Sequence, residues 1–592
     1  MSKLKSGAFR RRDFNRYTAA AGALAGLAPL AQLAPRFAGA AHAQAAIMER
    51  LTGLRSDQMG LNESFKAINF GNKSGAGWTR WTVGWNNAEK QIGKVDPFYF
   101  QGLDEQLKTM SVAAMVVGTP DHSGSGGPTA IPTGLYEPTM LGGAPNPANR
   151  FAEFMFNLAR DYAGRLNVFE IWNEVEIPST GANARYNTWA GGPTEYKQLV
   201  KVAGQAAKSA NPRARIITSP YSYFRDAEEG MVDGISRSLP FWDAFEAAVR
   251  EDAEMASLID GVALNLYRNP HDLWDRAWGA VPEYLQVPDR KGFFPRLASM
   301  GLAGKQAWLT EINAMPFDDP VPGWNPGSKS RDAEPLGLRL TMDEQAAYIW
   351  QALGTAAAAG WNKIFFQALQ DDNPVVDELW GLVRHNGNAQ NADESRARPA
   401  YWAYTLAARL LGDGDMSQLY VRVRPDAVLS KHRQNASRYK WGAQAVVVQK
   451  GDLRTTVIWN SSPDTVTVNV AAKGSEALLI DKTGNPQPLN TSGGAHNITI
   501  GPATVRFSWP NSPFGPLEDP VNYYYVGGDP MILIETGVSD HAVNIANFIR
   551  KDAAPENGSG PDATSAGDIV DNGPGMNPRV VGHDPNRVGR LR

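Results

Sequence analysis

The sequence predicts an α/β fold, a (β/α)8 TIM barrel followed by a C-terminal antiparallel β-sandwich. From about Met59 to Phe366, short apolar runs alternate with longer helical patterns, which is typical of repeated β/α units around a parallel sheet. After residue 412 the helical patterns stop, and closely spaced strand-like runs separated by turn residues follow, as in an antiparallel sandwich. A chain of 592 residues is also too long for one compact core, so at least two domains are expected.

The first 43 residues have the pattern of an export signal. The basic run Arg10–Phe14 (RRRDF) precedes a weakly apolar stretch from about Ala19 to Ala34, and Ala41–Ala43 supplies a small-x-small cleavage site. The paired arginines resemble those of twin-arginine signals, so we expect cleavage after Ala43 and a periplasmic or secreted mature protein. A membrane anchor is the alternative, but glycine and proline interrupt the apolar stretch, so no stable anchor is expected.

The barrel is predicted to occupy residues 44–412 and to contain eight strands. Each strand is a short apolar run, and a helical pattern or a long loop separates it from the next, as in a TIM barrel. In chain order the strands are Met59–Asn62, Thr79–Trp85, Ser111–Gly118, Val168–Trp172, Ile216–Ser219, Gly261–Leu266, Ala307–Thr310 and Lys363–Phe366. Helices are predicted at Phe151–Ala163, Tyr196–Ala210, Phe241–Asp252, Glu344–Ala359 and near Pro399–Leu411.

The β-sandwich is predicted over residues 413–510, where strand-like runs lie close together. Residues 511–592 are predicted to be a C-terminal extension in which order decays. From about residue 553 the extension is rich in Gly, Pro, Asp and Asn, and its small apolar surface cannot offset the entropy of ordering, so disorder is expected. The predicted sandwich strands are Tyr420–Val423, Gln444–Gln449, Thr455–Asn460, Thr465–Val470, Ala477–Asp481 and Asn497–Ile500.

Two of the predicted barrel strands end at a glutamate. The fourth continues into Trp172-Asn173-Glu174, and the seventh ends in Leu309-Thr310-Glu311. Catalytic groups of TIM barrels lie at the C-terminal ends of the strands, and strands four and seven lie close to opposite sides, so their ends can face each other across the mouth. Two carboxyl groups brought together are the minimum equipment for cleaving a glycosidic bond. The alternative is structural, with both glutamates ending strands or capping helices.

This pattern resembles glycoside hydrolase clan A, a group of retaining TIM-barrel glycosidases, with a layout nearest to family 39-like enzymes. In that clan the acid/base glutamate follows an asparagine at the end of strand four, and the nucleophile ends strand seven. The resemblance therefore assigns Glu174 as the acid/base and Glu311 as the nucleophile. Gly77–Trp81 resembles the strand-two arginine region of the clan, and Asn265–Tyr267 resembles its strand-six motif, in which many members carry His-x-Tyr. The resemblance covers roughly residues 59–502.

Retaining cleavage needs one carboxylate as nucleophile and one protonated carboxyl as acid, about 5–5.5 Å apart. Two carboxyl groups that close together cannot both ionise cheaply, so their pKa values separate. Arg80 and Tyr267, if they lie beside Glu311, favour its charged form. Glu174 then keeps the proton that it donates to the leaving oxygen. Asn173 is placed to hydrogen-bond the 2-hydroxyl of the sugar, a contact that strengthens in the transition state.

Further side chains could line a sugar pocket. His122 follows the third strand on a Gly-rich loop. Glu170 shares a strand face with Glu174 by period-two alternation, and we expect it to be a structural charge behind the site. Aromatic rings suit sugar stacking as well as a large core, and the chain has 17 tryptophans. The remaining candidates are Trp85, Trp324, Trp380 and Gln367.

Composition and motifs argue against several other classes of function. The net charge of −3, without a long basic run, gives no electrostatic footprint for nucleic acid binding. The absence of cysteine excludes thiolate catalysis and thiolate metal sites. The histidines lack zinc-site spacing, and no glycine motif for nucleotide phosphates occurs, so we expect neither a metal nor a cofactor. The acidic pairs Asp318-Asp319 and Asp371-Asp372 are expected in solvated loops.

The sequence therefore predicts an exported retaining O-glycoside hydrolase that cleaves an oligo- or polysaccharide by double displacement. A non-catalytic polysaccharide-binding protein on a barrel scaffold is the alternative from a different class. A third possibility is transglycosylation, in which a sugar hydroxyl replaces water. The sugar, its anomeric configuration and linkage, and endo or exo action depend on loops, and the sequence leaves these features and the oligomeric state open.

Overall fold

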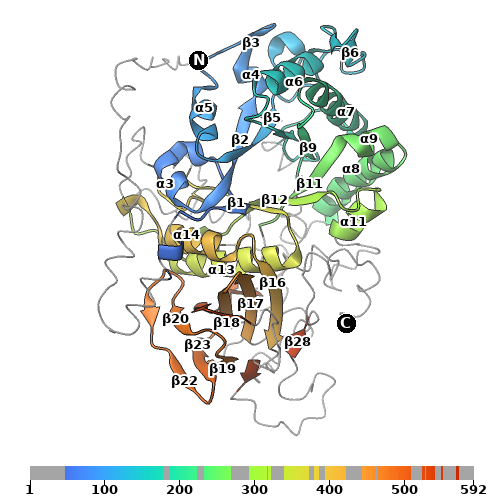
Figure 1. Ribbon diagram of the computed structural model, residues 1–592. Coiled ribbons are helices and arrows are strands. Elements are labelled where there is room, and N and C mark those ends of the chain that lie inside the picture. Colours follow the sequence, from blue (N-terminus) through green and yellow to red (C-terminus); the bar gives the residue numbers. More distant parts are fainter. Residues whose placement is uncertain are drawn as a thin grey trace, which may run out of the picture.

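The computed structural model contains a closed parallel barrel followed by antiparallel sheets (Figure 1). The predicted signal at 1–43 lies outside the residues that it describes, as does the segment from 553 apart from one short strand. Within the described part of the chain, no helix is long and apolar enough to cross a membrane. The described residues are 47, 49–51, 53–177, 187–222, 232–267, 293–316, 318–321, 339–371, 379–385, 394–421, 443–460, 465–507, 523–526, 528–539, 548–550 and 569–571.

Eight strands close the barrel in the order in which they occur along the chain. Each pairs in parallel with the next, and the last pairs with the first, so the TIM barrel is confirmed. Every predicted barrel strand is present, with ends shifted by a few residues at most positions. The strands are β1 (Ser56–Asn62), β2 (Ala76–Gly84), β5 (Ser111–Val117), β8 (Val168–Ile171), β9 (Arg215–Thr218), β11 (Ile259–Asn265), β12 (Gln306–Ile312) and β15 (Lys363–Phe366).

An apolar layer fills the barrel interior. Its members come from seven different strands of the closed sheet and still form one buried cluster, so they must point inward. At the corresponding place on β1 stands Gly60, where a Cβ atom would lie 2.4 Å from the ring of Phe365. Glycine is therefore needed there because the phenylalanine ring occupies the space of its side chain. The cluster consists of Trp78, Ala113, Val168, Ile217, Ala263, Trp308 and Phe365.

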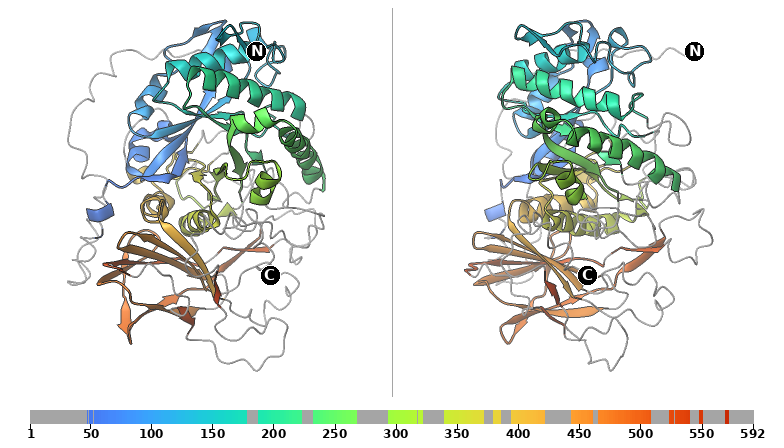
Figure 2. Two further views of the ribbon diagram at one scale, coloured as in Figure 1. Left: turned by 45° about the vertical axis from the view of Figure 1, so that its right-hand side comes forward. Right: turned by 90° about the vertical axis from the view of Figure 1, so that its right-hand side faces the viewer.

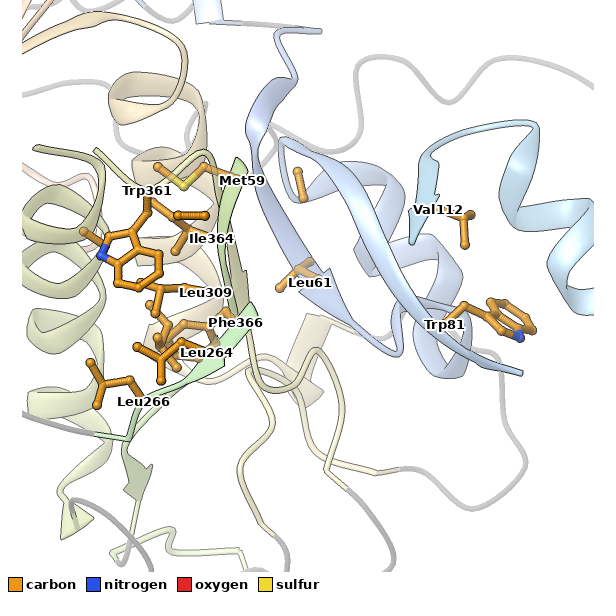
Figure 3. Close-up of a cluster of buried hydrophobic side chains, with 14 of the residues drawn as sticks. Met59, Leu61, Trp81, Val112, Leu264, Leu266, Leu309, Trp361, Ile364 and Phe366 are labelled. Atoms are coloured by element: carbon orange, nitrogen blue, oxygen red, sulfur yellow. The ribbon is translucent and has the colours of Figure 1, made fainter. Parts of the chain in front are cut away.

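The alternate residues of the same strands form a second core outside the barrel. Figure 3 shows Leu61, Leu309 and Phe366 in this cluster, beside Trp361. Trp361 stacks on Phe293 of a surrounding helix, with ring centroids 5.1 Å apart. The longer surrounding helices are α3 (Ile68–Lys73), α5 (Gln101–Leu107), α6 (Arg150–Asp161), α7 (Pro193–Ala210), α8 (Val232–Arg250), α9 (Ala253–Leu258), α11 (Phe293–Ser299), α13 (Met342–Ala359) and α14 (Pro399–Leu411). Strands of two or three residues lie in the loops: β3 (Glu89–Gln91), β4 (Lys94–Val95), β6 (Met140–Leu141), β7 (Ala144–Pro145), β10 (Tyr221–Ser222), β13 (Met315–Pro316) and β14 (Arg339–Leu340).

The C-terminal part forms antiparallel sheets. The largest has the order β21-β20-β26-β18-β17-β16-β28, and a second has the order β22-β23-β19-β27. Side chains of both sheets, such as Val447 and Ile458 of the first and Val468 and Ile498 of the second, share one buried cluster. The strands are β16 (Asp415–Val421), β17 (Ala443–Lys450), β18 (Leu453–Asn460), β19 (Val466–Ala471), β20 (Glu476–Ile480), β21 (Pro486–Gln487), β22 (Asn490–Ser492), β23 (Ala495–Ile500), β24 (Thr504–Phe507), β25 (Tyr523–Val526), β26 (Met531–Thr536), β27 (Phe548–Arg550) and β28 (Ile569–Asp571).

The predicted end of this region at residue 510 is too early. Strand β26 pairs with β18 on one side and β20 on the other, so it lies inside the largest sheet. Its apolar run Ile532–Ile534 is buried. These residues stabilise the sheet although the chain between 508 and 522 separates them from the predicted strands.

Helices α13 and α14 lie between the barrel and the C-terminal sheets (Figures 1 and 2). Thr341 and Glu344 form a capping box at the start of α13, and Gly360, with φ of 101°, ends it. The buried side chains of Trp350 and Gln351 donate hydrogen bonds to backbone carbonyls of the C-terminal part, at Lys482 (2.7 Å) and at Gly528 (3.1 Å). Lys482 Nζ in turn donates to Asp343 of the helix at 2.6 Å, so polar side chains of α13 that face the C-terminal part have hydrogen-bond partners there.

We expect Gly60→Ala to lower the free energy of unfolding by about 1–3 kcal/mol, because the added methyl overlaps the ring of Phe365 in a filled interior. Urea denaturation followed by circular dichroism measures this loss. Gly501→Ala is the matched control, since nothing lies within 4 Å of a Cβ atom at Gly501. Adding Phe365→Leu to Gly60→Ala should recover part of the loss. Equal stability of Gly60→Ala and the wild type would contradict the assigned role of this glycine.

Candidate active site

A polar layer lies directly above the apolar interior of the barrel. On each strand, the residue two positions beyond the apolar one points to the same side of the sheet, because side chains alternate along a strand. The two steps lead from Trp78 to Arg80 on β2 and from Val168 to Glu170 on β8. At the carboxyl ends of the strands, the side chains inside the barrel are therefore mainly hydrogen-bonding groups and no longer apolar packing residues. The layer consists of Asn62, Arg80, Met115, Glu170, Ser219, Asn265, Thr310 and Gln367.

Arg80 is the central cation of this layer. Its Nε and Nη2 donate to the two carboxylate oxygens of Glu170, at 2.8 and 2.7 Å. Nη1 donates to Glu311 Oε1 at 2.5 Å, and Nη2 also donates to Asn173 Oδ1 at 2.8 Å. The guanidinium therefore joins the ends of β2, β8 and β12 at one point. Burial opposes its charge, but the carboxylates of Glu170 and Glu311 outweigh burial and raise the pKa of Arg80.

Glu170 is the fully buried anchor for this cation. It is 0% exposed, and its two oxygens hold the guanidinium in a bidentate ion pair. Burial raises the pKa of Glu170 above its ordinary value, although the charge of Arg80 acts in the opposite direction. Both groups would be costly to bury alone. The sequence-based expectation that Glu170 is a charge behind the site agrees with this contact.

Glu311 reaches the site because β12 contains an extra residue. Leu264 of β11 is in register with Leu309, but the next residue, Asn265, is in register with Glu311. The bulge at Thr310 breaks strict alternation, so Thr310 and Glu311 both contact residues of the polar layer. The Tyr267 hydroxyl donates to Glu311 Oε2 at 2.5 Å. Each carboxylate oxygen of Glu311 thus accepts a hydrogen bond from a separate donor.

Glu174 follows a tight turn at the end of β8. Trp172 and Glu174 have φ of 71° and 43°, a left-handed conformation that costs non-glycine residues roughly 1–3 kcal/mol each. Burial of the Trp172 ring and its hydrogen bond from Nε1 to the Thr188 carbonyl hold the turn. The result is that Glu174 Oε1 accepts a 2.8 Å hydrogen bond from Asn265 Nδ2 on β11, two strands further along the sheet. Glu174 is buried, with 8% of the residue exposed.

The structure brings together five of the predicted site residues. Arg80 contacts Glu311 and Asn173, and Tyr267 also contacts Glu311. Glu174 is held by Asn265, two residues before Tyr267. Trp380 lies beside Tyr267, with ring centroids 5.0 Å apart and planes at 51°. This partly buried indole thus packs on the tyrosine that contacts Glu311, and it suits a stacking surface. Trp324 lies outside the described residues.

The prediction that Trp85 stacks on sugar is wrong. Its side chain is 0% exposed, because the ring packs against Phe151 and Phe154 with centroids 5.6 and 5.3 Å away. Its indole nitrogen donates to Glu89 Oε2 at 3.1 Å. Trp85 begins the short helix α4 (Trp85–Ala88), which turns the ring away from the mouth into the outer core. A sequence pattern cannot distinguish these two uses of a tryptophan.

His122 joins two loops above the barrel. One ring nitrogen lies 2.8 Å from Ser123 Oγ, and the other lies 2.9 Å from the Glu89 carbonyl oxygen. The ring thus connects the loop after β5 to β3. Within the described ranges, no contact joins His122 to Glu174 or Glu311, and its role in substrate binding remains a prediction.

The prediction that the acidic pairs are solvated is wrong for two of their members. Asp319 and Asp371 are buried on either side of Arg398, with N–O distances of 2.9 and 2.7 Å. Arg384 adds a second cation to Asp319 at 2.8 Å. Burial raises the pKa of Asp371 to about 6, against the opposing charge of Arg398. These ion pairs stabilise the chain after β15. The local sequence around each aspartate does not reveal its arginine partner, because that arginine lies further along the chain.

Sequence patterns named Asn265 and Gln367 but missed Thr310 and Asn62, the polar residues that contact them. Thr310 Oγ1 donates to Asn265 Oδ1 at 2.8 Å, and Asn62 Nδ2 donates to Gln367 Oε1 at 2.7 Å. Asn62 also donates to the Thr310 carbonyl at 2.9 Å. Period-two counting from the apolar layer would have found all four. Among the described residues, no cluster of His, Cys, Asp or Glu could hold a metal ion.

No family model matches the chain, and no curated protein matches it. Solved structures with a similar fold include a family 39 glycoside hydrolase from Bacteroides cellulosilyticus WH2, at 15% identity, 81% coverage of both chains and a TM-score of 0.47. A family 30 subfamily 8 xylanase from Clostridium acetobutylicum matches at 12% identity, 81% and 96% coverage and a TM-score of 0.44. A family 51 α-L-arabinofuranosidase from Bifidobacterium longum matches at 10% identity and a TM-score of 0.45. The match covers 79% of this chain and 89% of that one.

Two of these neighbours are named as glycoside hydrolases and the third as an arabinofuranosidase. Their identities are low and each TM-score is below 0.5. We therefore base the functional proposal on the residues of the site and on the strand pairing alone.

We expect Arg80→Met to lower the free energy of unfolding by about 3–5 kcal/mol at pH 7, because it leaves Glu170 buried without its cation. Burial then keeps the pKa of Glu170 above its value in the unfolded chain, so the folded protein binds more protons. Stability of the variant should therefore rise as pH falls from 7 toward 5, relative to the wild type. Urea denaturation at both pH values measures the difference.

Arg80→Met combined with Glu170→Gln is the control, since the second change removes the uncompensated charge. It should recover part of the stability at pH 7 and abolish the extra pH dependence. A loss that is identical at pH 5 and pH 7 in the single variant would show that Glu170 is not the group left charged.

Proposed function

We propose that the protein is a retaining O-glycoside hydrolase that cleaves an oligo- or polysaccharide by double displacement. The observation that carries the proposal is the convergence of two carboxyl groups with different surroundings on one polar layer. Glu311 accepts hydrogen bonds from Arg80 and Tyr267, and Glu174 accepts one from a neutral amide. An ionised nucleophile and a protonated acid need this kind of asymmetry.

Glu311 is the nucleophile in this proposal. Its carboxylate attacks the anomeric carbon while the bond to the leaving oxygen breaks, which gives a covalent glycosyl ester. The cation and the phenol hold both carboxylate oxygens in place before the reaction, so little reorganisation is needed. Trp380, beside Tyr267, offers a surface for the sugar ring that is being attacked.

Glu174 serves as acid and then as base. In the first step it donates its proton to the leaving oxygen, and afterwards its carboxylate removes a proton from the water that attacks the ester. Loss of the negative charge of Glu311 on ester formation makes the proton of Glu174 easier to release, because a repelling charge has disappeared.

Asn173 is proposed to bind the sugar hydroxyl next to the reacting carbon. Its Oδ1 accepts a hydrogen bond from Arg80, so the amide is oriented by the same guanidinium that holds Glu311. Its Nδ2 is the end that can donate to a hydroxyl group. The Thr188 hydroxyl also donates to the Asn173 carbonyl, which fixes the backbone at this point.

We also propose that the two larger C-terminal sheets form a β-sandwich that covers one side of the barrel, and that the enzyme acts outside the cytoplasm. The shared buried cluster of the two sheets supports the first statement. The arginine pair and the apolar stretch of the N-terminal sequence support the second. Exported hydrolysis of oligo- or polysaccharides agrees with both.

Glu311→Ala is expected to reduce turnover of aryl glycosides to background, because no nucleophile remains. Added azide should restore turnover and give a glycosyl azide, since the small anion can enter the space left by the carboxylate. Liquid chromatography with mass spectrometry detects this product. Glu105→Ala, a change to an exposed helix residue in a surface ion pair, is the control. Full activity of Glu311→Ala would overturn its assignment.

Glu174→Ala is expected to spare substrates with good leaving groups and to slow those with poor leaving groups by about 10²–10⁴-fold, the usual contribution of a general acid. Dinitrophenyl and alkyl glycosides of one sugar provide the comparison through their kcat/KM values. Equal losses on both would contradict the acid role. If a sugar panel gives binding heat in calorimetry but no turnover with any substrate, the protein is a binding protein instead.

A further inference from the structure

Asn265 lies at the strand position where many clan A members carry histidine, and it contacts Glu174 directly. We propose that Asn265, oriented by Thr310, is a positioning residue that directs the catalytic proton of Glu174 to Oε2, the oxygen that Asn265 does not contact. The inference rests on the proposed acid role of Glu174 and adds a device that sets which oxygen delivers the proton.

The first support is the chain of hydrogen bonds. Thr310 Oγ1 donates to Asn265 Oδ1 at 2.8 Å, and Asn265 Nδ2 donates to Glu174 Oε1 at 2.8 Å. Thr310 and Asn265 are both 0% exposed, so bulk water cannot substitute for either partner. The amide therefore has its acceptor end and its donor end committed to different neighbours.

The second support is chemical. A protonated carboxyl has one oxygen that bears the proton and one that only accepts. Because Asn265 presents an N–H to Oε1, a proton on that oxygen would face a donor and lose the hydrogen bond. The proton therefore belongs on Oε2. If the amide were rotated by half a turn, Oδ1 would face Glu174 and would hold the proton on Oε1 in a hydrogen bond to the amide.

The hydroxyl of Thr310 disfavours that rotation. A rotated amide would present its NH2 group to Thr310, so the hydroxyl would have to accept there, and its own proton would exchange the 2.8 Å hydrogen bond to Asn265 for the Leu264 carbonyl 3.5 Å away. Thr310 faces Asn265 through the regular alternation of β12 from Trp308, and the bulge then delivers Glu311 to the same layer one residue later. The nucleophile thus follows directly after the group that orients the acid.

An asparagine cannot exchange a proton in the way that a histidine can. The amide therefore remains a donor to Glu174 at every working pH, and the ionisation of the site depends on its acidic and basic groups alone. Among the described residues these groups are, on the strands and loops around Glu174, Arg80 of β2, Glu170 of β8, Glu176 after β8, Tyr267 after β11 and Glu311 of β12.

The test uses the pH dependence of kcat/KM in the full mature chain, on an alkyl glycoside with a poor leaving group. The basic limb reports loss of the acid proton. Asn265→Leu removes a hydrogen bond to the ionised form and should move the basic limb upward by about one to two pH units. Thr310→Val should also move it upward, because the amide can then rotate. An unmoved basic limb in both variants would overturn the proposal.

Thr310→Ser is the matched control, since it retains the hydroxyl and should keep the basic limb at its wild-type pH. A shift in Thr310→Ser as large as that in Thr310→Val would indicate a packing effect and overturn the proposal. A loss of activity without any shift of the limb would do the same, because a purely structural role lowers the rate at every pH.

A second readout does not depend on hydrolysis. With ¹³C-carboxyl-labelled glutamate, the signal of Glu174 is identified by its loss in Glu174→Gln, and its titration is followed in the wild type and in Asn265→Leu. A higher midpoint in Asn265→Leu supports the proposal even if the wild type hydrolyses no glycoside, the result that refutes the proposed function. An unchanged midpoint overturns the proposal whether or not the wild type is active.

Discussion

The ion pair network of Arg80 is the interaction on which the site depends. The guanidinium binds Glu170 with two hydrogen bonds and uses its remaining donors for Glu311 and Asn173. Three strands that are distant in sequence thereby meet at a fixed point. Such a network is costly to bury unless every partner is present, so the fold and the site constrain each other.

The site is built from the regular barrel and two local departures from it. The apolar layer and the polar layer above it follow from period-two alternation on a closed sheet. The bulge of β12 adds Glu311 to a layer that already contains Thr310, and the left-handed turn after β8 adds Glu174. Both departures lie at the mouth, where strain serves function. Glu174 and Glu311, the proposed acid and nucleophile, are therefore the two groups that a regular barrel would not present.

Much of the architecture could be predicted from sequence, because apolar runs with helical patterns between them identify strands such as Lys363–Phe366 well. Contacts between distant residues outside the site could not be predicted. The burial of Trp85 depends on two phenylalanines of α6, and the burial of Asp319 and Asp371 depends on Arg398. Strand β26 was missed because it returns to the sheet after a long separation in sequence. The proposed roles of the two glutamates followed from the resemblance to clan A at the ends of the fourth and seventh strands. The residues that orient them became apparent only from the arrangement of the polar layer.

The central claim is that Glu311 forms a covalent bond with the sugar. The most direct measurement is mass spectrometry of the mature protein after incubation with a panel of 2-deoxy-2-fluoro glycosyl fluorides, which slow the second step and trap the ester. The account predicts a single added sugar, located by peptide mapping at Glu311, and no adduct in Glu311→Ala. A sugar attached to a different residue, or turnover of a glycoside with inversion at the anomeric carbon, would contradict it.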